Sequence, residues 1–159
     1  SLLDYFSLQE IKEFKAYFYK NKEYKILQTS IISNNYDTIE VTVKNGDSNY
    51  KIYQVLEGIF YKDNIKNCHI KQKEIESEFL DIFTNNVEKR SWEKKHSADK
   101  TGNSFTKAIQ YEFKSKDVVR LSCYDWSKKF EDEIGYTDNL RVTIIDAYFR
   151  NWLNTVAHK

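Results

Sequence analysis

Residues 105–152 read FTKAIQYEFKSKDVVRLSCYDWSKKFEDEIGYTDNLRVTIIDAYFRNW and contain the most regular pattern in the chain. Apolar and polar side chains alternate over residues 105–113 and 118–126, as in half-buried strands, and the polar residues between them predict a tight turn. After an acidic loop, residues 140–145 predict a short strand and the following residues an amphipathic helix. This stretch therefore predicts a sheet with a helix packed on it. Its expected core residues are Phe105, Ile109, Tyr111, Val119, Leu121, Val142 and Ile144.

The residues that precede this stretch predict a helix and three strands. Ser7 and Glu10 form a capping box, which marks a helix start, and apolar residues at helical spacing extend that helix to about residue 19. Asn45 and Gly46 favour a hairpin turn, and Gly58 indicates a bulge or a close approach of another segment. Strands are expected over residues 24–33, 38–44 and 49–61.

The middle of the chain predicts a second helix and a long loop. From His69 to about Asn85 one face of the segment is apolar at helical spacing. Residues 87–103 show no period, so we expect a loop there. The resulting element order is α-β-β-β-α-β-β-β-α, in which each half is a helix followed by three strands. Because hairpin connections imply antiparallel pairing, the predicted fold class is α+β: one or more antiparallel sheets with helices packed on one face, in a single domain over residues 1–159.

Composition limits the classes of function. The chain has 159 residues, of which 25 are Lys or Arg and 24 are Asp or Glu, so its formal net charge is +1. A balanced charge gives no overall attraction to nucleic acid or acidic membranes. No apolar run approaches the roughly 20 residues that a membrane-spanning helix requires, so we expect a soluble domain. The chain begins at Ser1 without an initiator methionine, and we expect that an upstream segment was removed from it.

Two cysteines, Cys68 and Cys123, are the only ones in the sequence. An even count is compatible with a disulfide, which would place the protein in the periplasm or outside the cell. Two cysteines are equally compatible with a reduced cytoplasmic protein. The sequence leaves both alternatives open.

Catalytic and metal-binding arrangements are not evident. Cys68 precedes His69, but neighbouring side chains point apart and no oxyanion-forming stretch surrounds them. Ser97, between His96 and Asp99, is too close to both in sequence to form a triad. The acidic run lacks the alternating ligands of a calcium loop, and the histidines and cysteines lack zinc spacing. We therefore predict no catalytic residue, no metal and no cofactor.

Two charged segments of opposite sign are the better candidates for binding. Between Glu88 and Lys107 there are six Lys or Arg against three acidic residues, with a tryptophan among them. The acidic segment follows Trp126 and contains a tyrosine. A surface rich in aromatic residues favours recognition of another protein, and the two segments could also pair with each other. The candidate binding residues are Arg90, Trp92, Lys94, Lys95, His96, Trp126, Glu131, Asp132, Glu133 and Tyr136.

We therefore expect a non-enzymatic protein-binding module, such as a secreted or periplasmic protein of the inhibitor or immunity type. The element order also resembles small secretion chaperones, a resemblance that implies a homodimer holding an extended segment of a partner. A second alternative is an enzyme whose site combines distant residues, with Cys68 or His96 beside an acid. Binding of single-stranded nucleic acid by residues 89–107 is the expectation least favoured, because the total charge is balanced.

Overall fold

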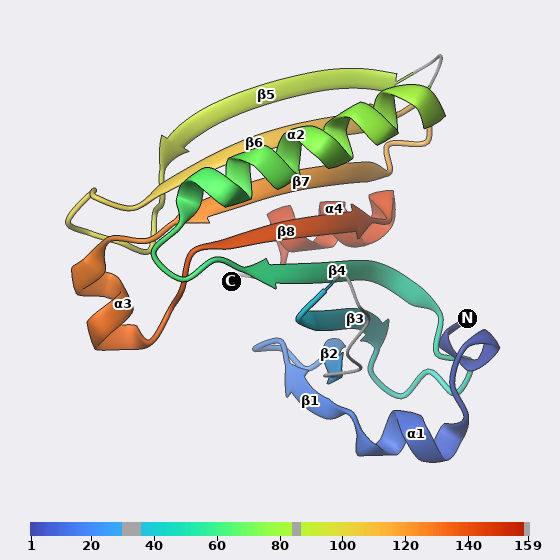
Figure 1. The fold of residues 1–159 in the computed structure, drawn as a ribbon. Helices are drawn as coiled ribbons and strands as arrows, with labels where there is room; N and C mark the ends of the chain where they lie inside the picture. The colour runs from blue at the N-terminus through green and yellow to red at the C-terminus, as the bar shows by residue number, and fades with distance from the viewer. Residues whose placement is uncertain (30–35, 84–86, 158–159) are drawn as a thin grey trace.

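The structure is a computed structural model that describes residues 1–29, 36–83 and 87–157. Its strands are β1 Lys15–Phe18, β2 Tyr24–Thr29, β3 Thr38–Lys44, β4 Ile52–Phe60, β5 Val87–Lys95, β6 Phe105–Phe113, β7 Val118–Asp125 and β8 Asn139–Ile145. Its helices are a 3-10 turn at Leu2–Asp4, α1 Leu8–Glu13, α2 Ile65–Ile82, α3 Lys128–Ile134 and α4 Ala147–Thr155. The strands form one antiparallel eight-stranded sheet (Figure 1). The antiparallel α+β class expected from the sequence is confirmed.

The order of strands across the sheet divides the chain into two similar halves. The order is β1-β2-β3-β4-β8-β7-β6-β5, so the halves meet where β4 pairs with β8, the last strand of each half. Each half is a helix followed by four strands, not the three expected from the sequence, because β1 and β5 are additional edge strands. The halves differ most in their helices, since α1 has 6 residues and α2 has 18.

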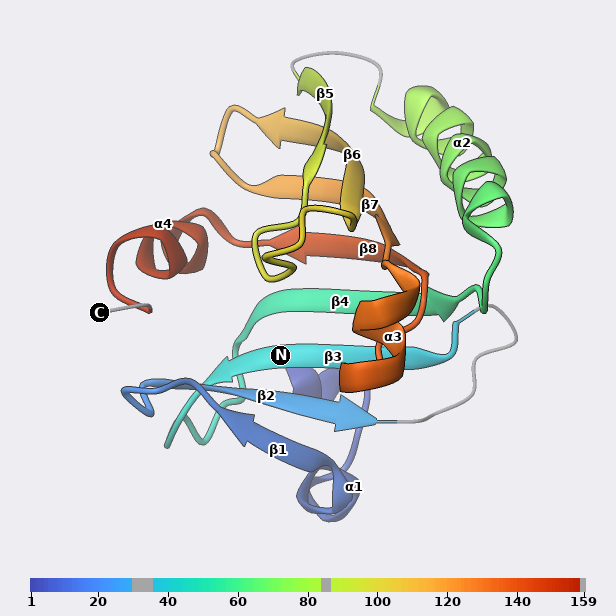
Figure 2. The ribbon, with the colours of Figure 1, turned by 90° about the vertical axis from the view of Figure 1, so that its left-hand side faces the viewer.

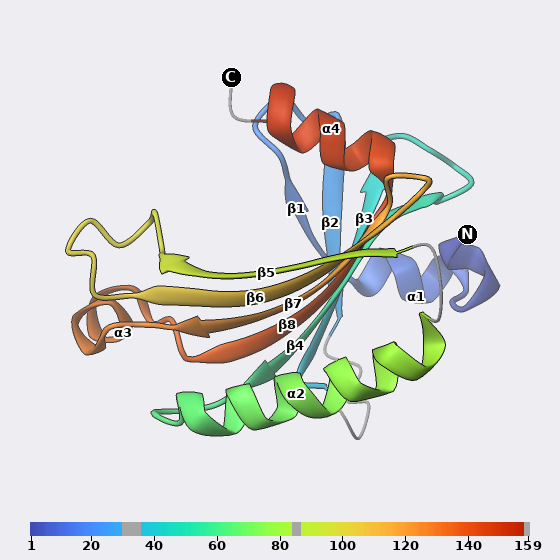
Figure 3. The same ribbon diagram turned by 90° about the horizontal axis from the view of Figure 1, so that it is seen from above.

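One face of the sheet carries the largest core and is covered by α2. Residues paired directly across antiparallel strands share a face, and the pairs Cys123–Leu140 and Leu121–Val142 place those side chains beneath α2. Helix α1 packs on the same face of the N-terminal half, over Leu27. The position of α2 is evident in Figure 3. The buried residues of this core are Cys68, Ile75, Ile109, Tyr111, Val119, Leu121, Cys123, Leu140 and Val142.

Helix α4 packs on the opposite face, so the expectation that the helices share one face holds only for α1 and α2. Figure 2 shows α2 and α4 on opposite sides of the sheet. Phe149 and Trp152 of α4 pack against Tyr24 of β2, with ring centroids 4.8 and 4.7 Å apart. The Trp152 indole also donates a hydrogen bond to Glu23 Oε2 over 2.7 Å. Trp152 is therefore a core residue, and α4 covers one end of this face.

Local signals placed several elements correctly. The capping box at Ser7 and Glu10 is present, and β3 and β6 have the expected bounds. Gly58 does mark a close approach, because a Cβ there would lie 2.7 Å from Thr38 Oγ1. Part of the expected strand 24–33 lies outside the described residues, and so does the expected end of the second helix at Asn85.

Other boundaries and burial states differ from the expectation. Helix α1 ends at Glu13, and residues 15–18 pair with β2 instead of extending the helix. Helix α2 begins at Ile65, where Asn64 caps it, so Cys68 lies inside the helix. Ile144 is 53% exposed although it was expected in the core. Pairing with β2 thus outweighs the helical pattern of residues 15–18, and the cap at Asn64 sets the start of α2. None of the helices within the described ranges is long and apolar enough to cross a membrane.

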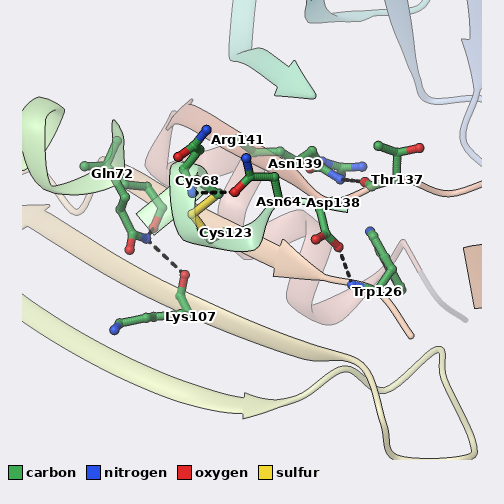
Figure 4. The surroundings of a disulfide bond; sticks show 12 residues. Asn64, Cys68, Gln72, Lys107, Cys123, Trp126, Thr137, Asp138, Asn139 and Arg141 are labelled. Atoms are coloured by element: carbon green, nitrogen blue, oxygen red, sulfur yellow. Dashed lines mark hydrogen bonds between the residues drawn. A yellow bond between two sulfur atoms is a disulfide. The ribbon is translucent and has the colours of Figure 1, made fainter. Parts of the chain in front are cut away.

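A disulfide and a buried glutamine attach α2 to the sheet. Cys68 of α2 is bonded to Cys123 of β7, and both residues are fully buried. One turn further along α2, Gln72 donates a hydrogen bond to the backbone carbonyl of Lys107 over 3.0 Å (Figure 4). It donates a second one to the backbone carbonyl of Leu121 over 3.1 Å. These contacts join α2 to strands β6 and β7 and fix its position on the sheet.

Removal of this disulfide is expected to destabilise the protein without changing the fold. The bond closes a loop with a sequence separation of 55 residues, which corresponds to about 4 kcal/mol in the chain-entropy description. The Cys68→Ala, Cys123→Ala double variant should therefore unfold at a lower urea concentration, with an unchanged far-ultraviolet circular dichroism spectrum before the transition. An unchanged midpoint would contradict this prediction.

Candidate functional site

The face of β5–β8 opposite α2 is polar and is the candidate site. Three rows of directly paired residues cross the four strands on this face, and we call them the open face. A fourth row contains Glu112 and Ile145, and there α4 begins to cover the sheet, because Arg150 of α4 pairs with Glu112 at 2.9 Å. No helix in the described ranges lies over the other rows (Figure 3). The rows are Arg90–Gln110–Arg120–Thr143, Trp92–Ala108–Ser122–Arg141 and Lys94–Thr106–Tyr124–Asn139.

Arg120 is a half-buried cation at the centre of this face. Its Nε and Nη2 donate to Gln110 Oε1 over 3.1 and 2.8 Å, and the Trp92 ring lies over its guanidinium with 5.6 Å between centres. Burial lowers the pKa of Arg120, although an arginine stays charged under all ordinary conditions. Among the described residues, no carboxylate forms an ion pair with it. Within the described part of the chain, Arg120 is therefore a half-buried charge whose hydrogen-bond partner, Gln110, is neutral.

A second cation–aromatic pair lies on β7 and β8. The Arg141 guanidinium is 4.9 Å from the centre of the Tyr124 ring, and its Nε donates to Asn139 Oδ1 over 3.2 Å. The His96 ring contacts both Tyr124 and Trp126, with centroids 5.6 and 4.4 Å apart. Burial, followed by the charges of nearby cations, lowers the pKa of His96. Rings and cations thus alternate across the open face.

Two hollows flank this ring cluster. The basic pocket, of about 350 Å³, is lined chiefly by Trp92, Lys94, Lys95, His96, Arg120 and Tyr124. The aromatic pocket, of about 450 Å³, is lined chiefly by Phe60, Trp126, Tyr136, Asn139 and Arg141. Among the residues that the structure describes, no carboxylate lines either hollow. The indole N–H of Trp126 is buried and has no hydrogen-bond partner within the described part of the chain.

The basic segment that leads to this face is a strand and not a loop. β5 pairs with β6 along its whole length, from Val87–Phe113 to Lys95–Phe105. It is an edge strand that meets α2 through the ion pair between Lys89 and Glu76, and it has no apolar face, so its sequence shows no alternation. Charged side chains are also what protects an edge strand from pairing with other chains. Arg90 lies on the open face but is paired with Glu88 at 2.6 Å.

The acidic segment forms helix α3, which corrects the expectation of an acidic loop. Its three carboxylates share two lysines of the same helix: Lys128 pairs with Asp132 at 3.2 Å and Lys129 with Glu133 at 3.8 Å. Glu131 also lies 3.7 Å from Lys128. Within the described ranges, no ion pair joins this helix to β5, so the expected pairing of the two charged segments is absent. The structure therefore provides no unpaired acidic surface on α3.

Six of the ten candidate residues gather around the two hollows: Trp92, Lys94, Lys95, His96, Trp126 and Tyr136. Arg120 and Arg141 join them, and sequence reasoning missed both. The signal was present on β7, where Arg120, Ser122 and Tyr124 alternate with Val119 and Leu121 and so had to lie on the non-core face. What the sequence did not reveal was that this face has no helix over it.

Asp99 holds the loop that carries His96, and this excludes a triad with Ser97. Its carboxylate accepts hydrogen bonds from Thr101 N, Thr101 Oγ1, Ser104 Oγ and Ser127 Oγ over 2.8, 2.7, 2.6 and 2.9 Å. These donors, Ser104 first and then Thr101, hold the pKa of Asp99 well below its usual range. Asp99 therefore has a structural role: it fixes the loop after β5, whose residues His96 and Ser97 line the basic pocket.

The hypothesis of an enzyme site built on Cys68 is wrong, because its sulfur is in a disulfide and cannot act as a nucleophile. His96 is also remote from it, since the ring contacts of His96 lie on the opposite face of the sheet. No group of three or more His, Cys, Asp or Glu within residues 1–29, 36–83 and 87–157 could hold a metal ion. No protein-family model, curated protein or solved structure matches this chain.

Replacement of Asp99 by asparagine should destabilise the protein most at neutral pH. A carboxyl with a depressed folded-state pKa contributes stability above its unfolded-state pKa of about 4, and loses that contribution as the pH falls further. The stability difference between wild type and Asp99→Asn should therefore be largest near pH 7 and shrink below pH 4. Urea unfolding at both pH values measures it, and a difference independent of pH would contradict the prediction.

Asp138 should give the opposite pH dependence. It is buried, accepts a hydrogen bond from Trp126 N over 2.8 Å, and lies near other acidic residues. Burial, opposed by that hydrogen bond and reinforced by the nearby acids, raises the pKa of Asp138 to about 6. The folded protein therefore holds a proton that the unfolded chain releases near pH 4, so stability falls as the pH rises from 4 to 6.

The Asp138→Asn variant keeps an oxygen for the Trp126 amide and removes this titration. Relative to wild type, it should gain roughly 1–3 kcal/mol between pH 4 and pH 7. Urea unfolding of both proteins at each pH provides the measurement. A constant difference would show that Asp138 does not titrate in this range.

Proposed function

We propose that this protein is a non-enzymatic binding module that recognises an acidic segment of another protein through its open face. The observation that carries the proposal is the separation of cations from carboxylates on the surface. The chain as a whole is almost neutral, with 25 Lys or Arg against 24 Asp or Glu. Yet both hollows of the open face are lined by cations and rings and by no carboxylate. Complementary potential favours an anionic partner at such a surface.

The aromatic side chains support a protein partner. Trp92 and Tyr124 are half-buried on the open face, and Tyr136 is 46% exposed at its edge. Tryptophan, tyrosine and arginine are the residues that contribute most to protein interfaces, because they combine a large contact area with hydrogen-bond donors. An antiparallel sheet places four strands across about 15 Å. A partner segment of about five extended residues could therefore cross from β5 to β8.

Single-stranded nucleic acid is the second candidate, because exposed rings between arginines can stack on bases. The positions of the acidic residues make nucleic acid a weaker candidate than an acidic peptide. Glu88 and Glu112 lie in the row next to the open face and are paired there with Arg90 and Arg150, so a phosphate chain that followed the strands would compete with these carboxylates for the arginines. A short acidic peptide that crosses the strands would avoid these carboxylates.

The disulfide supports a periplasmic or secreted location as part of this proposal, because disulfides persist mainly in oxidising compartments. Dimerisation, which the chaperone-like element order implied, stays a prediction, and sedimentation equilibrium of the purified protein tests it.

Selection of peptides from a random displayed library on the immobilised protein tests the proposed function. We expect enrichment of peptides rich in Asp and Glu, whose affinity is then measured by fluorescence anisotropy. Trp92→Ala should weaken binding at least tenfold, whereas Tyr148→Ala should not change it, because Tyr148 is 63% exposed on α4 and lies outside the open face. Thermal unfolding of both variants confirms that they are folded.

Two results would count against the proposal. If no acidic peptides are enriched, or if Trp92→Ala binds them as wild type does, the open face is not the recognition surface. If a single-stranded oligonucleotide binds more tightly than the selected peptides at low salt, the second candidate replaces the first.

A further inference from the structure

The basic pocket has more positive charge than one carboxylate side chain requires. Lys94, Lys95 and Arg120 all line it, and His96 lies at its wall. No carboxylate lines it, and within the described ranges none of these three cations forms an ion pair with an acidic residue. Three cations around one hollow favour a doubly charged anion over a singly charged one.

Arg120 has hydrogen-bond donors to spare in this pocket. A guanidinium has five N–H groups, and two of its nitrogens donate here to the single oxygen Gln110 Oε1. A half-buried charge with only a neutral partner costs free energy, and such costs occur at functional sites, where a ligand supplies the missing counter-charge. Trp92 lies over the guanidinium and limits the directions in which it can move. Arg120 is therefore held in position for an oxyanion.

The other lining groups suit the same ligand. Ser97, Thr106 and Ser122 line the pocket and carry hydroxyl donors, and a phosphate monoester has three strong acceptor oxygens with a charge between −1.5 and −2 at pH 7. The volume of about 350 Å³ falls within the range of about 300–1,000 Å³ that is usual for ligand pockets. The pocket has room for a phosphate and for the side chain that bears it, which would contact the rings of Trp92 and Tyr124.

We propose that the basic pocket binds the phosphate group of a phosphorylated side chain in the partner protein, with Arg120 as its central donor. This inference rests on the proposed function and deepens it, since it assigns the chemistry of the partner's central residue. Lys94 and Lys95 supply the remaining charge at the rim, where both are exposed. The aromatic pocket then accommodates the residues that flank the phosphorylated one.

Isothermal titration of the intact protein with four probes tests the proposal. The probes are a phosphotyrosine peptide, the same peptide with glutamate in place of phosphotyrosine, inorganic phosphate and adenosine monophosphate. We expect the phosphopeptide to bind at least tenfold more tightly than the glutamate peptide, and inorganic phosphate to compete with it. Arg120→Gln should weaken phosphopeptide binding by about 10- to 100-fold, the usual effect of losing charge-assisted hydrogen bonds.

Lys71→Gln is the matched control, because Lys71 lies on α2, on the opposite face of the sheet, and is already paired with Glu74 at 3.1 Å. It should leave the affinity unchanged. Removal of an uncompensated half-buried charge should not lower the thermal midpoint of Arg120→Gln. If that variant does not fold, the double variant Lys94→Gln, Lys95→Gln changes only exposed side chains and should weaken the phosphopeptide by at least tenfold.

Equal affinity for the phosphopeptide and the glutamate peptide would overturn the inference and leave the proposed function standing. Loss of binding in Lys71→Gln equal to that in Arg120→Gln would also overturn it, since the effect would then be one of general charge. Tighter binding of adenosine monophosphate than of the phosphopeptide would assign the pocket to a nucleotide. Phosphate binding without any peptide binding would keep the anion site and contradict the proposed function.

Discussion

Helix α2 lies across β6, β7 and β8, where the Cys68–Cys123 disulfide bonds it to β7 and Gln72 donates to two strand carbonyls. This attachment determines the use of both faces of the C-terminal half. Val119, Leu121 and Cys123 of β7 are buried under α2, and because a strand alternates, Arg120, Ser122 and Tyr124 must point to the other side. The open face is thus a direct consequence of where α2 is fixed.

The two halves of the chain use that other face differently. In the N-terminal half and at the centre, α4 packs on it through Phe149 and Trp152 against Tyr24. In the C-terminal half, α4 reaches only as far as the ion pair between Arg150 and Glu112. On this face, α4 therefore covers the N-terminal half and the centre of the sheet and leaves most of the C-terminal half uncovered. The candidate site lies in the half that the last helix leaves uncovered.

The fold was predictable wherever one strand face or one helix face is buried. β3 and β6 have the expected bounds, and residues such as Ile109, Leu121 and Val142 are in the core as predicted. The errors have a common cause. β5 is an edge strand without an apolar face, and β1 replaces the expected end of α1 because pairing with β2 stabilises an extended backbone there. In both cases the extended backbone is stabilised by pairing with the next strand along the chain, a contact that neither helical nor alternating periodicity represents.

The sequence by itself determined which segments alternate, where the first helix is capped and which side chains in the C-terminal half avoid water, since these depend on neighbours within a few residues. It also indicated that Trp92, Lys94, Lys95 and His96 form a basic aromatic segment. Only the tertiary structure decided that Arg120 lies under Trp92, that Arg141 lies over Tyr124, and that no carboxylate lines the hollows beside them. Strand pairing and register bring these groups together, and both depend on contacts between residues far apart in the chain.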